Sequence, residues 1–167
     1  HCHTRRQRQM CIRDSQRFGR DLLVRLDKGE ELHDAIRSLS NNGISTAAIT
    51  SGIGRVRGTE IGFLDSDGIY QKMEIEHPME LLSMQGNLAP GPDGPFTHIH
   101  IVASDDDHVV RGGHLFEATV EVTAEIHMRV LDGDGATMVR EATESDFFGL
   151  SFCAVSYTHL TLPTSVT

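Results

Sequence analysis

Apolar and polar residues alternate with a period of two along most of this chain, and that pattern predicts a β-rich protein. The clearest case covers residues 116–130, where one set of alternate positions is apolar and the other carries mostly charged or hydroxyl side chains. Successive side chains of a strand point to opposite faces, so this segment predicts a long strand with one buried face. Because fifteen residues exceed the usual strand length, we expect a bend or bulge within it.

Shorter segments with strand character fill most of the remaining sequence. They cover residues 18–27, 44–50, 59–64, 69–75, 80–88, 96–103, 137–140 and 149–153. Residues 65–68 (DSDG) and 132–135 (DGDG) predict hairpin turns, the second joining the long strand to residues 137–140. Residues 105–108 predict a further turn, and residues 89–95 (APGPDGP) a rigid loop. The glycine-rich residues 51–54 predict a bend between close backbones, since no Lys-Ser/Thr pair follows as in a phosphate loop.

One helix is predicted, over residues 30–40. Leu32, Ala35, Ile36 and Leu39 recur at the spacing of a single helical face. Acidic residues precede this stripe, which suits a helix N-terminus, and Gly43 supplies a left-handed end. The elements together predict an α+β domain with one main helix packed on a twisted, mostly antiparallel β-sheet or partial barrel.

Length and charge narrow the functional classes. The 167 residues suffice for one domain. The net charge is −9 overall and −12 over residues 16–153, which argues against a broad nucleic-acid or anionic-membrane surface. No apolar run approaches the ~20 residues of a membrane span, and no signal peptide is recognisable. Because Cys2, Cys11 and Cys153 form no disulfide framework, we expect a cytoplasmic protein.

Both ends of the chain look foreign to the domain. Residues 10–15 (MCIRDS) and 154–164 (AVSYTHLTLPT) resemble translated sequencing adapters. We therefore expect tails at residues 1–16 and 154–167, a domain at residues 17–153, and no function for the tail residues His1, Cys2, His3 and His159. The alternative is a natural basic arm at Arg5, Arg6 and Arg8 that contacts phosphate.

Three histidines carry the most specific chemistry. His98 and His100 occupy alternate positions of a predicted strand, so their imidazoles project side by side, and His114 follows on the next strand. Three converging neutral nitrogens with an open position suit zinc, although nickel, copper and iron also accept imidazole. The adjacent Gly112 and Gly113 would let the backbone turn tightly. The alternative is a structural polar cluster.

Six short motifs in order identify a resemblance. They are residues 26–31 (LDKGEE), 50–54 (TSGIG), 78–82 (PMELL), 85–88 (QGNL), 98–100 (HIH) and 112–115 (GGHL). Over most of residues 17–153 the chain resembles the plants-and-prokaryotes-conserved (PPC) domain family, in its prokaryotic stand-alone type. The resemblance implies a homotrimer, a metal ion, most often zinc, at His98, His100 and His114, and protein contacts around Glu80. The plant members' DNA-binding AT-hook is absent from this sequence.

Three functions follow from these observations. The first is a trimeric, divalent-metal-binding module with a regulatory or small-ligand-binding role, in which the Glu/Thr face of residues 116–130 either packs between subunits or faces water. The second is a metal-dependent enzyme, with Glu80 or Glu117 as acid or base and Arg111 holding a small anionic substrate. Direct DNA binding is the third, and the acidic charge disfavours it.

Overall fold

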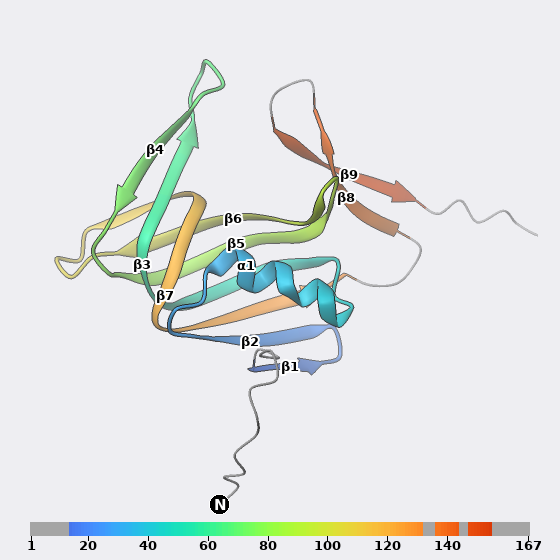
Figure 1. Cartoon of the computed structure of the whole chain (residues 1–167), viewed down its shortest axis with the longest axis horizontal. Coiled ribbons are helices and arrows are strands. Elements are labelled where there is room, and N and C mark those ends of the chain that lie inside the picture. The colour runs from blue at the N-terminus through green and yellow to red at the C-terminus, as the bar shows by residue number, and fades with distance from the viewer. Residues whose placement is uncertain (1–13, 132–135, 144–146, 155–167) are drawn as a thin grey trace, which may run out of the picture.

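The computed structural model describes residues 14–131, 136–143 and 147–154, and strands make up most of them (Figure 1). In chain order the elements are β1 (Asp14–Phe18), β2 (Asp21–Asp27), α1 (Leu32–Arg37), the 3-10 helix η1 (Ser38–Asn42), β3 (Ala47–Leu64), β4 (Tyr70–Ile75), β5 (Met79–Gly91), β6 (Gly94–Ser104), β7 (Val110–Val130), β8 (Ala136–Ala142) and β9 (Phe148–Ala154). The prediction of a mostly antiparallel sheet with one helix is confirmed.

Seven strands form the main sheet in the order β1-β2-β7-β6-β5-β3-β4, and β7 also pairs with β3. Strands β3, β5, β6 and β7 therefore each pair with two others of this group, which bends the sheet strongly. β3 and β7 pair antiparallel from Ala47 opposite Val130 to Gly62 opposite His114, with several register shifts. These shifts confirm the irregularity expected in the long strand. Val122 lies at one of them and is 60% exposed, whereas most apolar positions of that face are buried.

Close backbone contact explains the glycine-rich bend predicted at residues 51–54. A Cβ atom on Gly54 would lie 2.3 Å from the carbonyl oxygen of Thr123, and the residue has φ = 151°. Only glycine fits both conditions. The bend lies within β3. The two strands predicted at residues 44–50 and 59–64 are therefore parts of one continuous strand, which begins at Ala47.

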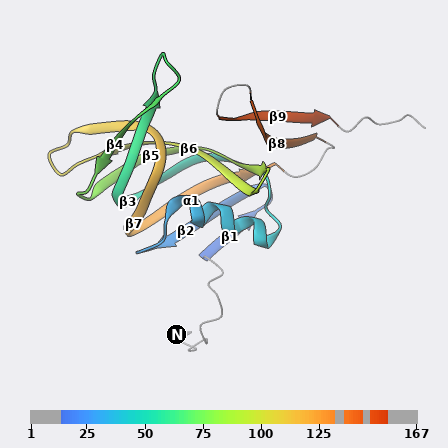
Figure 2. The same cartoon turned by 45° about the horizontal axis from the view of Figure 1, so that its top comes forward.

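The helix closes one side of the core (Figure 2). Its α-helical part is shorter than predicted, because η1 takes over at Ser38. The Glu31 carboxylate caps it by accepting the Asp34 N–H at 2.7 Å, and Gly43 ends η1 with φ = 80°, as expected. The predicted apolar stripe is buried and packs with the inner faces of β6 and β7.

Three sequence-based expectations are corrected. Residues 18–27 are not one strand, because Gly19 adopts φ = 64° and turns β1 back onto β2. Residues 89–95 are not a loop, because β5 and β6 continue their ladder to Gly91 opposite Gly94. β8 pairs with β9 in a separate two-stranded sheet rather than with β7.

Some expectations concern residues at or beyond the described ranges. The turn at residues 132–135 and the tail residues His1, Cys2, His3, Cys11 and His159 lie outside them. β1 begins at Asp14 and β9 ends at Ala154, so each overlaps a predicted tail by one to three residues. The adapter origin of the tails stays a prediction.

Two hairpins project from the same side of the main sheet (Figure 1). The turn predicted at residues 65–68 closes the first, between β3 and β4, and its large apolar side chains are exposed, with Phe63 at 62%. The second is β8–β9, where Phe152 is 73% exposed. Within the described residues, no helix is long and apolar enough to cross a membrane.

Candidate metal centre

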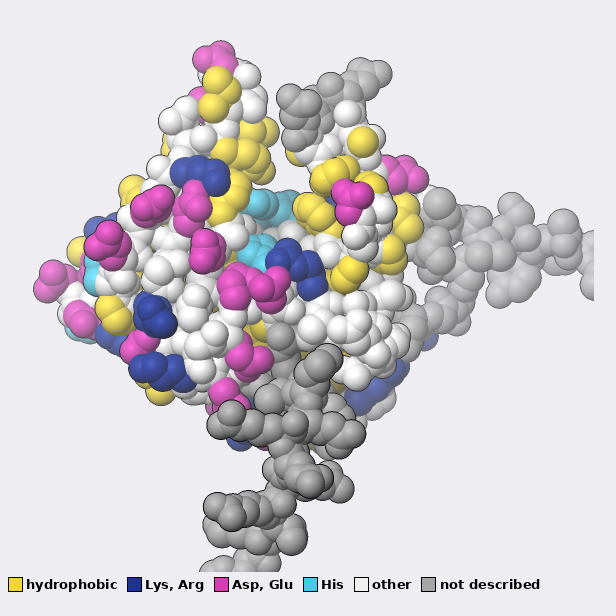
Figure 3. All heavy atoms as spheres, viewed as in Figure 1, with side chains coloured by type: hydrophobic (Ala, Val, Ile, Leu, Met, Phe, Trp, Pro, Cys, Tyr) yellow, Lys and Arg dark blue, Asp and Glu magenta, His cyan; other side chains and the backbone are white. Residues whose placement is uncertain are grey.

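The three predicted histidines meet at the junction of β6 and β7. His98 and His100 project from the same face of β6, and His114 lies directly opposite His100 on β7. One ring nitrogen from each residue lies within 4.8 Å of the others, and the ring centroids are 5.0–5.3 Å apart. Figure 3 shows histidine side chains between the two projecting hairpins. The i, i+2 spacing therefore produced the expected convergence.

Gly112 and Gly113 let strands approach one another, which corrects the predicted tight turn. Both residues lie within β7. A Cβ atom on Gly113 would lie 2.7 Å from the carbonyl oxygen of Gly62 on β3, and one on Gly112 would lie 2.8 Å from the carbonyl oxygen of Ile101 on β6. These approaches hold β7 tightly between its neighbours immediately before His114.

Two of the three imidazoles are poised to act as neutral ligands. Burial, together with the nearby Arg140 guanidinium, lowers the pKa of His98 to about 4. Burial also lowers the pKa of His114 to about 4, with His98 and His100 as further causes. Both rings are therefore uncharged at neutral pH, the form in which an imidazole nitrogen binds a metal ion.

A fourth histidine lies behind the cluster, on α1. His33 is only 7% exposed. Its Nε2–H donates to the carbonyl oxygen of Leu115 at 3.1 Å, so the neutral ring accepts the Thr97 hydroxyl at Nδ1, 2.7 Å away. Thr97 precedes His98 and Leu115 follows His114. His33 thus ties together the two strands that carry the cluster.

This tie spans the point where β6 and β7 separate. Their ladder ends at the pair His100–His114. Beyond it, Thr97 pairs with Leu88 on β5, whereas Leu115 pairs with Ile61 on β3. The buried imidazole therefore supplies hydrogen bonds that the diverging strands cannot make to each other, and it fixes the backbone on which the three ligand residues stand.

Arg140 of β8 contacts the cluster from the other side. Its guanidinium donates to Nδ1 of His98 at 3.2 Å, to the Asn87 side-chain oxygen at 2.7 Å and to the Phe148 carbonyl oxygen at 3.1 Å. A guanidinium can only donate, so His98 Nδ1 is the acceptor and the neutral ring carries its proton on Nε2. That Nε2 lies 3.2 Å from Nε2 of His100.

The residues present fit a divalent metal ion. Three imidazole nitrogens converge, and Nδ1 of His114 is buried without a hydrogen-bond partner among the described residues. This unpaired polar group carries a free-energy cost that a bound cation or its ligands would remove. Imidazole suits zinc and the neighbouring first-row metals. An ion held by three histidines keeps at least one position for water or another ligand, and there it would act as a Lewis acid.

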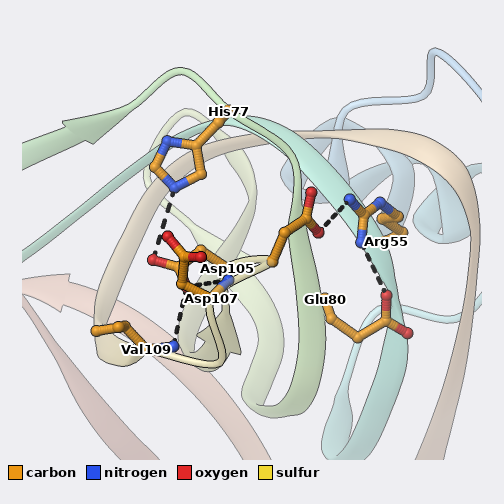
Figure 4. A network of polar contacts seen from close by, with 7 residues as sticks. Arg55, His77, Glu80, Asp105, Asp107 and Val109 are labelled. Carbon is orange, nitrogen blue, oxygen red and sulfur yellow. Dashed lines mark hydrogen bonds and ion pairs between the residues drawn. The ribbon is translucent and has the colours of Figure 1, made fainter.

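Two other predicted site residues, Glu80 and Arg111, are engaged elsewhere. Glu80 pairs with Arg55 at 3.4 Å, and Arg55 also pairs with Asp106 at 2.8 Å (Figure 4). Arg111 pairs with Asp105 at 2.7 Å. Asp105 also accepts two backbone N–H groups in the predicted turn at residues 105–108, and together these contacts lower its pKa. Neither Glu80 nor Arg111 is brought to the three imidazoles.

The third, Glu117, lies opposite Glu60 across the β3–β7 ladder. Together with Glu74 and Glu76 these side chains line a separate cavity of about 240 Å³. Glu117 lies three positions beyond His114 along an extended strand, a distance of about 10 Å. Among the described residues, no carboxylate joins the three-histidine cluster.

Sequence reasoning missed two residues that support the cluster from different sides, His33 and Arg140. His33 sits beside the apolar stripe of the predicted helix, and a histidine next to a buried face was the available signal. Arg140 is separated from His98 by 42 positions and carries no local signal. Its role depends on the β8–β9 hairpin, which sequence reasoning had paired differently.

The fold and the cluster define a sheet-dominated α+β domain with a candidate three-histidine metal site. The model of the Plants and Prokaryotes Conserved (PCC) domain matches residues 13–132, and the chain belongs to this family. The resemblance inferred from the six motifs is thereby confirmed. A search of curated proteins found no match.

Solved structures support the same assignment. A metal-containing protein from Archaeoglobus fulgidus is 36% identical with a TM-score of 0.69, over 83% of this chain and 97% of that one. A plant- and prokaryote-conserved (PPC) protein from Pyrococcus horikoshii is 29% identical with a TM-score of 0.68, over 82% and 92%. A Bacteroides thetaiotaomicron protein, named as a conjectural DNA-binding protein, shares the fold at 19% identity and a TM-score of 0.75, over 85% and 99%.

Proposed function

We propose that this protein is a trimeric module that binds one divalent metal ion per subunit, with zinc preferred, and uses the open coordination position for a regulatory or small-ligand-binding role. The observation that carries the proposal is the convergence of three imidazoles whose ligand nitrogens lie within 4.8 Å of one another, one of them with a buried nitrogen that finds no partner among the described residues. The metal-containing relative from Archaeoglobus fulgidus supports it.

Binding is favoured over catalysis because of what surrounds the imidazoles. A hydrolytic metal site needs a general acid or base within hydrogen-bond reach of the reacting atoms. The predicted candidates Glu80 and Glu117 lie in other contacts, and the described residues place no carboxylate in the cluster. Direct DNA binding is disfavoured by the net charge of −12 over residues 16–153.

Self-association is supported by the outer surface of the sheet. Large apolar side chains on four of its strands are about half exposed, namely Leu23, Ile53, Leu82 and Val122. Leu23 lies opposite His127 and Ile53 opposite Glu125 on β7, so these two flank the Glu/Thr face of that strand. Exposed apolar side chains grouped with polar ones are typical of a surface that another subunit covers.

The test combines elemental analysis and light scattering on the purified protein. We expect about one metal ion per chain in a particle three times the mass of the chain. Replacing His98, His100 and His114 together by alanine should abolish the metal, whereas the exposed His77→Ala serves as a control that retains it. Any metal that stays on the triple variant would be bound outside the three-histidine cluster.

The same variants separate a functional from a structural metal. If the triple variant keeps the trimer mass and the far-UV spectrum, the ion serves a function beyond holding the fold. If the variant falls to monomers or unfolds, the ion is structural. Unchanged metal content in the triple variant would refute the ligand assignment, and a monomeric wild-type protein would refute the trimer.

A further inference from the structure

Among the described residues, Arg140 is a buried cation with uncharged partners. The residue is 7% exposed, and the hydrogen-bond acceptors in the described part of the chain are an amide oxygen, a carbonyl oxygen and the imidazole of His98. Its Nε–H is buried without an acceptor. Within the described ranges, no carboxylate pairs with it. Removing a guanidinium from water costs free energy unless an anion compensates its charge. The described residues around Arg140 supply no such anion.

Among the described residues, no carboxylate joins the three imidazoles, and Arg140 is a cation beside His98 without a carboxylate partner. Lys72 also lies close enough to His114 to help lower the pKa of that ring, but it pairs with Glu60 at 2.7 Å. Neutral imidazoles would leave both charges of a divalent ion uncompensated. A bound metal ion would therefore make this part of the surface strongly attractive to anions.

We propose that the metal-loaded cluster binds a small oxyanion, a carboxylate or phosphate group, at its open position, and that Arg140 is the second contact of that anion. The proposal rests on the proposed metal site and names the ligand class for it. It assigns the anion-binding role to Arg140 of β8 and not to Arg111, which Asp105 already neutralises.

Proton placement on His98 links the two binding events. Arg140 now donates to Nδ1 of His98, so the proton of the neutral ring is on Nε2. A metal ion at Nε2 requires that nitrogen to be unprotonated, and the ring proton then resides on Nδ1. An N–H at Nδ1 repels the N–H of Arg140, so metal binding releases the guanidinium from His98. The freed donor is then available to an oxyanion, and metal and anion each strengthen the binding of the other.

The experiment uses the full chain loaded with Co²⁺, whose visible absorption reports changes in coordination. Acetate and inorganic phosphate are titrated separately at constant ionic strength, with perchlorate as the weakly coordinating reference. We expect saturable spectral change with acetate or phosphate and none with perchlorate. The anion that binds more tightly identifies the carboxylate or the phosphate group as the ligand chemistry.

The decisive variant is Arg140→Met, with Arg140→Lys as a second variant that keeps the charge. We expect Arg140→Met to weaken anion binding at least tenfold and to tighten Co²⁺ binding in perchlorate, since a competing donor to His98 is gone. Arg140→Lys should be intermediate, and it decides the question if the methionine variant fails to fold. Arg111→Met is the matched control and should bind the anion like wild type.

Two outcomes overturn the proposal and are distinguishable from each other. If wild-type protein binds Co²⁺ but shows no anion response, or if the Arg140 variants bind the anion as tightly as wild type, the role of Arg140 is refuted and the metal site stands. If wild-type protein binds no metal at this cluster, the proposed function fails, and the inference fails with it.

Discussion

Replacing His33 by leucine tests whether the buried imidazole holds β6 and β7 together behind the cluster. Leucine keeps an apolar side chain in a site that is 7% exposed, but it removes the hydrogen bonds to Thr97 and to the Leu115 carbonyl. Each buried group left without a partner costs about 1–3 kcal/mol. We expect the free energy of unfolding to fall by about 2–4 kcal/mol.

Urea unfolding of the metal-free protein measures this loss. With a denaturant dependence of about 2 kcal/mol per molar, the middle of the range for a small domain, the midpoint should move down by roughly 1–2 M. Thr97→Val provides the matched partner. The double variant should lose less than the sum of the single losses, with a coupling of about 0.5–3 kcal/mol, because both changes remove the same hydrogen bond.

A second measurement separates positioning from stability. Zinc affinity of His33→Leu, measured under conditions where the variant is fully folded, should fall by roughly 10–100-fold, as for other residues that orient metal ligands. A variant that unfolds like wild type would refute the energetic reasoning. A variant that is destabilised but binds zinc like wild type would show that His33 supports the fold alone.

Three further predictions concern pH, packing and the peripheral ion pairs. The pKa values of His98 and His114 are lowered to about 4 in the folded protein, so the unfolded chain binds protons first as the pH falls. The metal-free protein should therefore lose stability between about pH 6.5 and 4. Urea midpoints measured at pH 7, 5 and 4 would show this loss. Bound metal should be released as the pH falls toward about 4, where protons compete for the same ring nitrogens, as elemental analysis after dialysis would show. Gly113→Ala places a Cβ atom 2.7 Å from the Gly62 carbonyl oxygen and should cost about 1–3 kcal/mol in urea unfolding; an unchanged midpoint would mean that β3 and β7 can move apart freely. Glu80→Gln should change the free energy of unfolding by less than about 1 kcal/mol, because the ion pair of Glu80 is exposed and lies apart from the imidazoles. Zinc affinity in calorimetric titration should change by less than about twofold. A large loss of zinc affinity would mean that Glu80 takes part in the metal site.

Local patterns predicted the elements where a short-range rule determines them. The apolar stripe of the helix, the hairpin turn at residues 65–68 and the left-handed end at Gly43 all follow from side-chain spacing or from a φ value that few residues tolerate. The same holds for His98 and His100, whose shared face is a property of any extended strand. The outcome for β8 was different, because its period of two is compatible with either neighbour, and only the structure shows its pairing with β9.

The sequence by itself therefore determined the strand-rich character, the single helix and the convergence of His98 with His100. The tertiary structure alone decided which distant residues complete the cluster. His33 lies 65 positions from His98 and Arg140 lies 42 positions away, and they reach it only because α1 packs where β6 and β7 separate and because β8 crosses beside β5. The tertiary structure also placed three predicted site residues away from the imidazoles, namely Glu80, Arg111 and Glu117. Such contacts depend on strand register and sheet curvature, which are set by the packing of the whole core and not by the order of neighbouring residues.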